Sequence, residues 1–158
     1  MNLVKEIEKE LGDEWIANIY QKKIRSQRTR SHFLDIQESE NTAEIKYSLL
    51  GIELKVRNKR FACPELSTAR YLRVFARLGI REFALPYNIA RISGVADELE
   101  SSWQKMLLLL EKFSIDKTPQ VRGRIRASLI KHLRQQINLI GAGPKMPEFD
   151  KTTKQRNN

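Results

Sequence analysis

Arginine side chains at helical spacing are the residues of this sequence best suited to bind a charged partner. Arg70, Arg73 and Arg77 occupy positions i, i+3 and i+7 of one segment, so a helix would place them on a shared face. Guanidinium groups bind phosphate oxygens in pairs, and each neutralised phosphate of a nucleic acid releases condensed counterions. The three arginines therefore predict a ridge that contacts a phosphate backbone.

Two further stretches, residues 21–30 and 117–147, carry positive charge without any acidic residue. Acidic residues gather elsewhere, so charge is segregated along the chain, as expected of a protein with a polyanion surface. We expect phosphate contacts from the ridge and from both stretches, at Lys22, Lys23, Arg25, Arg28, Arg30, Arg70, Arg73, Arg77, Arg122, Arg124 and Arg126. This prediction requires that cations from distant segments converge on one surface.

A second set of residues has the types found in metal-dependent nucleases. Asp35 follows the apolar pair Phe33-Leu34, and the segment Gly51-Ile52-Glu53-Leu54-Lys55-Val56 comes later. Alternation along a strand places Glu53 and Lys55 on the same face, as a shared reaction centre requires.

An acid followed by a hydrophobic-Glu-x-Lys strand resembles the restriction-endonuclease-like nucleases. The resemblance implies that Asp35 and Glu53 ligate a divalent metal such as Mg²⁺, and that Lys55 orients the attacking water. It also implies an optional further acid from the first helix, Glu10 or Glu14. The alternative interpretation is that these charges alternate on the solvent face of an antiparallel sheet.

The remaining nucleophiles and metal ligands do not assemble into a recognisable site. His32, His132 and Cys63 give no Ser-His-Asp or Cys-His arrangement, and no glycine-rich loop suited to phosphate is present. Cys63 stands beside Pro64 among apolar residues, which predicts a small buried apolar side chain. Outside the nuclease hypothesis we therefore predict no cofactor, no metal and no catalysis.

Composition restricts the class of protein that can carry these residues. The chain has 158 residues, 41% hydrophobic and 30% charged, with a formal net charge of +10, which suits one folded domain. A single cysteine excludes an intrachain disulfide and favours a reducing compartment. The longest apolar run, residues 106–110, is far shorter than the roughly 20 residues of a membrane span. We expect a cytoplasmic protein that binds no membrane.

Apolar periodicity predicts the helices that must position these side chains. Spacings of three and four residues indicate amphipathic helices over about 3–24, 64–78, 93–113 and 118–140. Pro64 suits the first turn of the second helix, and Gly79 suits its left-handed carboxyl-terminal cap. Thr118 and Pro119 are typical of a helix start, and Gly141 of a helix end.

The strand signals cluster instead of alternating with helices. Residues 30–61 favour two or three antiparallel strands with a polar turn at 38–41, and residues 80–87 favour a short strand. Clustering predicts an α+β fold of about four helices with a small two- or three-stranded antiparallel sheet. Residues 1–141 are predicted to form one compact domain, followed by a flexible basic tail at 142–158.

These observations favour a small, basic, non-enzymatic protein that binds the phosphate backbone of DNA or RNA. A metal-dependent nuclease that uses Asp35, Glu53 and Lys55 is the first alternative. The second is an adaptor that docks on an acidic protein partner, with its tail ordering on contact.

Overall fold

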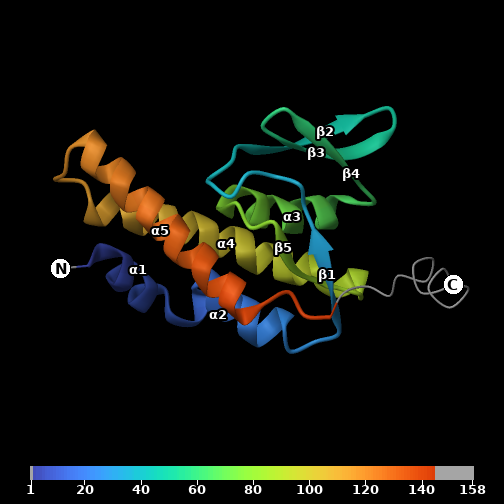
Figure 1. Cartoon of the computed structure of the whole chain (residues 1–158), viewed down its shortest axis with the longest axis horizontal. Coiled ribbons are helices and arrows are strands. Elements are labelled where there is room, and N and C mark those ends of the chain that lie inside the picture. The colour runs from blue at the N-terminus through green and yellow to red at the C-terminus, as the bar shows by residue number, and fades with distance from the viewer. Residues whose placement is uncertain (1, 145–158) are drawn as a thin grey trace, which may run out of the picture.

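The structure, a computed structural model, describes residues 2–144 and confirms the predicted α+β class (Figure 1). Most of the predicted tail lies outside the described residues. The elements in chain order are α1 (Leu3–Leu11), a 3₁₀ turn η1 (Gly12–Glu14), α2 (Ile16–Ile19), a π-helical turn η2 (Tyr20–Ile24), β1 (Thr29–Phe33), β2 (Ala43–Ser48), β3 (Gly51–Val56), β4 (Lys59–Cys63), α3 (Leu66–Leu78), β5 (Glu82–Pro86), α4 (Ile89–Phe113) and α5 (Pro119–Ile140).

The strands form two separate antiparallel sheets. β1 pairs with β5, so that Thr29 faces Pro86 and Phe33 faces Glu82 across the ladder. β2, β3 and β4 form a three-stranded sheet that packs on α3, at the top of Figure 1. The region predicted to hold two or three strands therefore holds four. Three of them form one sheet, and β1 pairs with the distant β5 instead of with its sequence neighbours.

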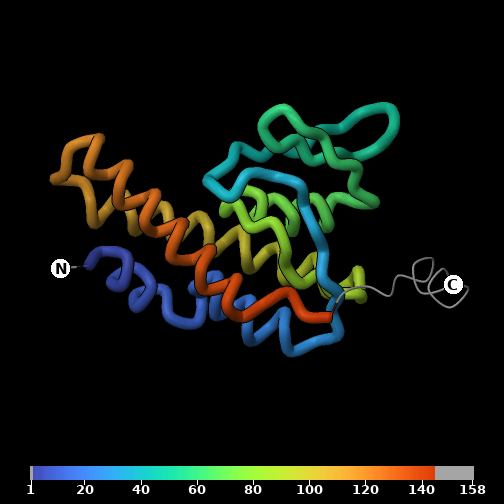
Figure 2. Tube along the Cα trace, in the orientation of Figure 1, coloured from blue at the N-terminus to red at the C-terminus, as the bar shows by residue number. Residues whose placement is uncertain are grey.

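The helices pack into a body that joins the two ends of the chain. α4 packs against α3 and also against α1 and α2, while α5 contacts α1, α2 and α3. The hydroxyl of Tyr20 accepts a hydrogen bond from the Ala84 amide at 2.8 Å and donates one to the Gly141 carbonyl at 2.7 Å. In Figure 2 the red end of α5 accordingly lies beside the blue early segment. The buried rings of Phe75 and Phe83 stack at 4.2 Å in the core between α3 and β5.

Three predicted helix boundaries are wrong, each for a local reason. The helix expected over 3–24 breaks at Gly12, which adopts a φ of 53° and starts the 3₁₀ turn. Pro64 precedes α3 because Glu65 is the extended residue before the first turn. α4 begins at Ile89 because the side chain of Asn88 accepts a hydrogen bond from Ala90 N at 3.0 Å.

Other boundary predictions are confirmed. Thr118 caps α5 by accepting from Val121 N at 3.3 Å, Pro119 is its first residue, and Gly141 follows its last. Gly79 ends α3 with a φ of 72°, and a Cβ there would lie 2.3 Å from the Ser39 carbonyl oxygen. Glycine is thus required at position 79 for both backbone conformation and space. No helix in the described part of the chain is long and apolar enough to cross a membrane.

Candidate nucleic-acid interface

The predicted arginine ridge of α3 faces α4 and is paired with carboxylates of that helix. Arg73 and Arg77 both reach Glu100, with nitrogen–oxygen distances of 2.8 and 3.1 Å. Arg70 reaches Asp97 at 2.7 Å. The Glu100 side chain is only 13% exposed, so this ion-pair cluster is largely removed from water.

The environment of Arg77 indicates that this arginine of the ridge takes part in packing between α3 and α4. Burial lowers the pKa of Arg77, an effect that the Glu100 charge opposes without cancelling. The guanidinium also lies over the ring of Trp103, 5.5 Å from its centre. Phosphate binding by this arginine would require breaking a half-buried ion pair, so the ridge is better explained as a link between α3 and α4.

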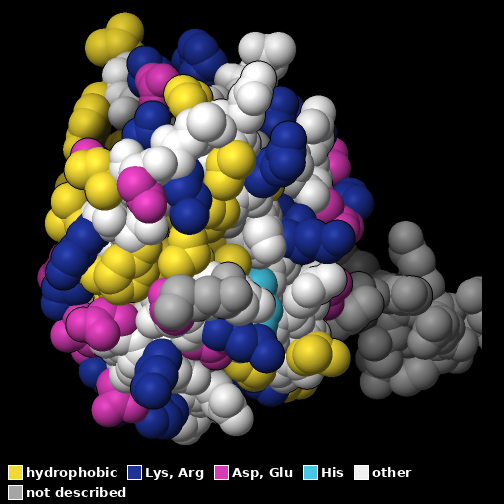
Figure 3. All heavy atoms as spheres, turned by 90° about the vertical axis from the view of Figure 1, so that its left-hand side faces the viewer, with side chains coloured by type: hydrophobic (Ala, Val, Ile, Leu, Met, Phe, Trp, Pro, Cys, Tyr) yellow, Lys and Arg dark blue, Asp and Glu magenta, His cyan; other side chains and the backbone are white. Residues whose placement is uncertain are grey.

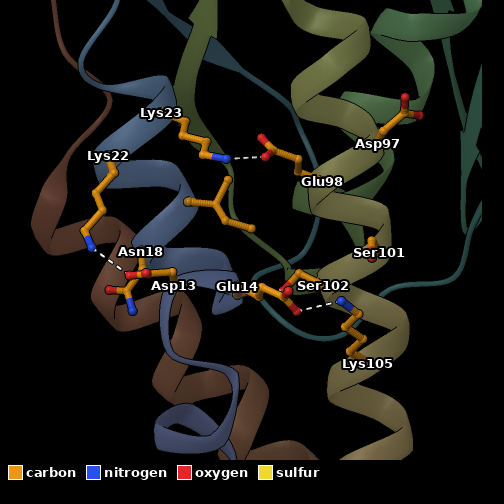
Figure 4. Close-up of a pocket in the computed structure, with 11 residues that line it drawn as sticks. Asp13, Glu14, Asn18, Lys22, Lys23, Asp97, Glu98, Ser101, Ser102 and Lys105 are labelled. Atoms are coloured by element: carbon orange, nitrogen blue, oxygen red, sulfur yellow. Dashed lines mark hydrogen bonds and ion pairs between the residues drawn. The ribbon is translucent and has the colours of Figure 1, made fainter.

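Lys22 and Lys23 line a cleft of about 540 Å³ between the α1–η2 segment and α4 (Figure 4). Ion pairs in this cleft are Lys22–Asp13 at 2.8 Å, Lys105–Glu14 at 2.7 Å and Lys23–Glu98. Four carboxylates and three lysines line the cleft in total. The cleft therefore presents no excess of positive charge to a ligand, although the two predicted lysines are exposed.

Arg28 and Tyr87 form an exposed stacked pair at one end of the two-stranded sheet. The Arg28 guanidinium carbon lies 4.9 Å from the Tyr87 ring centre, and the Tyr87 amide donates to the Arg28 carbonyl at 3.2 Å. Arg91 is exposed nearby in sequence, on the first turn of α4. Within residues 2–144 neither arginine forms an ion pair. We call Arg28, Tyr87 and Arg91 the Arg28–Tyr87 platform.

The other two arginines of the first acid-free stretch are less accessible than Arg28. Arg25 is half-buried, and its Nη1 donates to Thr29 Oγ1 at 3.3 Å. Arg30 is half-buried on β1 opposite Leu85. Arg28 is therefore the predicted arginine of this stretch that is best placed to meet a partner.

The three predicted arginines of α5 have different surroundings. Arg126 donates three hydrogen bonds to Glu40, two from Nε at 2.9 and 3.0 Å and one from Nη2 at 2.5 Å. Hydrogen bonding to Glu40, opposed by burial, raises the pKa of Arg126. Arg122 is half-buried, whereas Arg124 is exposed beside α1. Arg122, Arg124 and Arg126 are therefore close in sequence but do not form one exposed surface.

The predicted cations do not converge on one positive surface. The Arg28–Tyr87 platform lies where β1 and β5 meet the start of α4, near the end of α5 (Figure 1). Arg124 lies near the start of α5, a helix of 22 residues that is about 33 Å long. Between these ends, the ridge is occupied by carboxylates of α4.

The residues of the nuclease hypothesis lie on two different elements, the segment after β1 and strand β3. Asp35 follows β1 and forms an exposed ion pair with Lys59 at 2.8 Å, and a hydrogen bond from that lysine lowers the pKa of Asp35. Glu53 and Lys55 lie on β3, where Lys55 stands opposite Glu44. Residues 2–144 contain no group of three or more His, Cys, Asp or Glu side chains that could hold a metal ion.

On β3, the buried residues Leu54 and Val56 alternate with the less buried Glu53 and Lys55. The charged pair therefore points away from the face that packs on α3. This arrangement matches the alternative interpretation, in which charges alternate on the solvent face of a sheet.

Comparisons with known proteins leave the function to be inferred from the residues themselves. No family model, no curated protein and no solved structure matches this chain. Among the surfaces described above, the Arg28–Tyr87 platform combines exposure, positive charge and an aromatic ring. Sequence reasoning missed Tyr87 and Arg91, although an aromatic residue at the end of the predicted strand at 80–87 was a usable signal.

Proposed function

We propose that the protein binds nucleic acid without catalysing a reaction, and that the Arg28–Tyr87 platform is its contact surface. The observation that carries the proposal is an exposed guanidinium stacked on an exposed tyrosine, with no carboxylate paired to it in the described residues. Arginine planes and aromatic rings stack on bases, and the same guanidinium can bind phosphate oxygens. Arg91, exposed on the first turn of α4 four residues after Tyr87, is the proposed second phosphate contact.

The free energy of binding a phosphate should differ between this surface and the paired arginines of α3. A phosphate that binds Arg28 or Arg91 displaces water, whereas one that binds Arg73 must compete with the carboxylate of Glu100 at 2.8 Å. The formal charge of +10 adds a long-range attraction for any polyanion. The net charge brings the nucleic acid to the protein, and the platform holds it.

A binding titration tests the proposal. The affinity for a fluorescently labelled oligothymidylate is measured by anisotropy at about 50 and about 200 mM salt, and it is expected to fall steeply as salt rises. The double variant Arg28→Gln/Arg91→Gln is expected to bind on the order of tenfold or more weakly, because a stack and two phosphate contacts are lost.

The matched control is Lys22→Gln/Lys46→Gln, which removes the same charge from two exposed lysines that are paired with acids. It is expected to change the affinity by no more than about threefold. Equal losses in the two double variants would show that only net charge matters. An affinity independent of salt would reject the phosphate contacts themselves.

A further inference from the structure

Among the described residues, a second surface with unpaired basic side chains lies between α1 and α5, at the left of Figure 1. Two hollows of about 610 and 290 Å³ adjoin there and share Asn2, Val4 and Ser128 as lining residues. Together they form one groove between the first turn of α1 and the part of α5 that runs to Gln135, which we call the α1–α5 groove. Figure 3 views this end of the molecule, where dark-blue Lys and Arg side chains are visible around a histidine.

The charges that line the α1–α5 groove are all of one sign. No Asp or Glu lines either hollow, and the ionisable residues are Lys5, Lys117, Arg124, Lys131 and His132. By contrast, the cleft between the α1–η2 segment and α4 is lined by four carboxylates. A further hollow, beside Lys59 of β4, is lined by two carboxylates. Among residues 2–144, the four lysine and arginine side chains of the groove form no ion pair.

The acid that touches the groove wall is already engaged. Glu8 accepts from Gln136 Nε2 at 2.8 Å and lies 2.8 Å from His132 Nε2. Burial alone would raise the pKa of Glu8, but hydrogen bonds from Gln136 and His132 outweigh it and lower the value. The carboxylate is hydrogen-bonded by His132 and Gln136, and the charge of Lys5 also lowers its pKa. Within residues 2–144 it forms an ion pair with His132 but with none of the groove's lysines or Arg124.

The spacing of the cations indicates the size of the anion. Arg124 and Lys131 stand at i and i+7 on α5, so they share a face about 10 Å apart along the axis, with Ser128 between them. Lys5 belongs to α1, on the other side of the groove, and Lys117 precedes α5. Cations at this separation fit an anion longer than one phosphate.

We infer that the α1–α5 groove binds a small polyanion that carries two or more phosphate groups. Serine and asparagine side chains in the groove supply hydrogen bonds, and the positive end of α1 adds a favourable field. The groove lining holds no Phe, Tyr or Trp, so it lacks the stacking surface that the Arg28–Tyr87 platform offers to a base. The inference goes beyond nucleic-acid binding because it uses different residues and another class of ligand.

Calorimetric titration with inorganic tripolyphosphate at low salt tests the inference. The expected result is one binding site, with an affinity on the order of tenfold higher than that for orthophosphate, because the groove offers separated cations. The Arg124→Gln/Lys131→Gln variant is expected to lose on the order of tenfold or more in affinity. Both side chains are exposed, so thermal unfolding should be unchanged and loss of fold is excluded as the cause.

Two control variants separate this inference from the proposed function. Lys22→Gln/Lys46→Gln removes equal charge elsewhere, and Arg28→Gln/Arg91→Gln removes the platform; both are expected to bind tripolyphosphate as the unmodified protein does. Undiminished binding in Arg124→Gln/Lys131→Gln, or equal affinity for orthophosphate, overturns the inference. Loss of oligothymidylate binding in that same variant also overturns it, because the groove would then belong to the nucleic-acid interface.

Discussion

Replacing Glu100 with glutamine tests whether the arginines of α3 serve the fold or a ligand. The side chains of Arg73 and Arg77 are 22% and 19% exposed, and both form an ion pair with the carboxylate of Glu100. Removing one partner from a buried ion pair costs about 3–5 kcal/mol, since the remaining charge is left uncompensated. Because about a fifth of each arginine side chain is exposed and glutamine still accepts a hydrogen bond, we expect a loss of about 2–4 kcal/mol for Glu100→Gln.

Urea unfolding followed by tryptophan fluorescence gives the free energy of unfolding, and a thermal melt should show a decrease of about 4–16 °C. Glu98→Gln is the matched control, because Glu98 lies on the same helix in an exposed pair with Lys23. Its expected cost is about 0–1 kcal/mol. A loss below about 1 kcal/mol for Glu100→Gln would refute the assignment. Arg73 and Arg77 would then have to be counted as an open phosphate-binding surface.

Three further predictions test other parts of the fold. Gly79→Ala should cost about 2–5 kcal/mol in urea unfolding, because φ is 72° and the new Cβ would meet the Ser39 backbone; a loss under about 1 kcal/mol would contradict this packing. The lowered pKa of Glu8 adds stability that is fully present above its unfolded pKa of about 4.3 and is lost as pH falls through the folded value. Glu8→Gln should therefore lose less stability than the unmodified protein between about pH 6 and pH 3, and an identical pH profile would exclude this linkage. Leu49 and Leu50 are fully exposed at 107% and 99%, so a serine at either position should change the free energy of unfolding by less than about 0.5 kcal/mol; a larger loss would mean that the turn packs on another part of the chain.

The features that could be predicted from sequence are those encoded within a few residues. Thr118-Pro119 and Gly141 fix both ends of α5, because a cap and a terminator act on the backbone next to them. Gly79 similarly ends α3. The interruption at Gly12 was missed because apolar spacing continues across it at Leu11 and Trp15, so hydrophobic period alone cannot report a backbone break.

Long-range pairing could not be predicted, and it forms the two-stranded sheet. β1 pairs with β5 across β2, β3, β4 and α3, and no local pattern specifies that partner. The three-stranded sheet was easier, since its strands follow one another through short turns. The Arg28–Tyr87 pair also depends on long-range pairing. Arg28 precedes β1 and Tyr87 follows β5, so the two residues meet only because these strands pair, and neither residue alone indicates the contact.

For the candidate site too, local features could be predicted from the sequence and long-range contacts could not. Helical period correctly placed Arg70, Arg73 and Arg77 on one face, but it could not tell what that face meets. A complementary signal was present in Asp97 and Glu100, which stand at i and i+3 on the helix after β5 and match the arginine spacing. Charge that is segregated along a chain is therefore not the same as charge that is free in the fold: segregated blocks of opposite sign are well suited to pair when their helices pack. Among residues 2–144, the lysine and arginine side chains of the Arg28–Tyr87 platform and of the α1–α5 groove form no ion pair, and these two proposed binding sites lie toward opposite ends of α5.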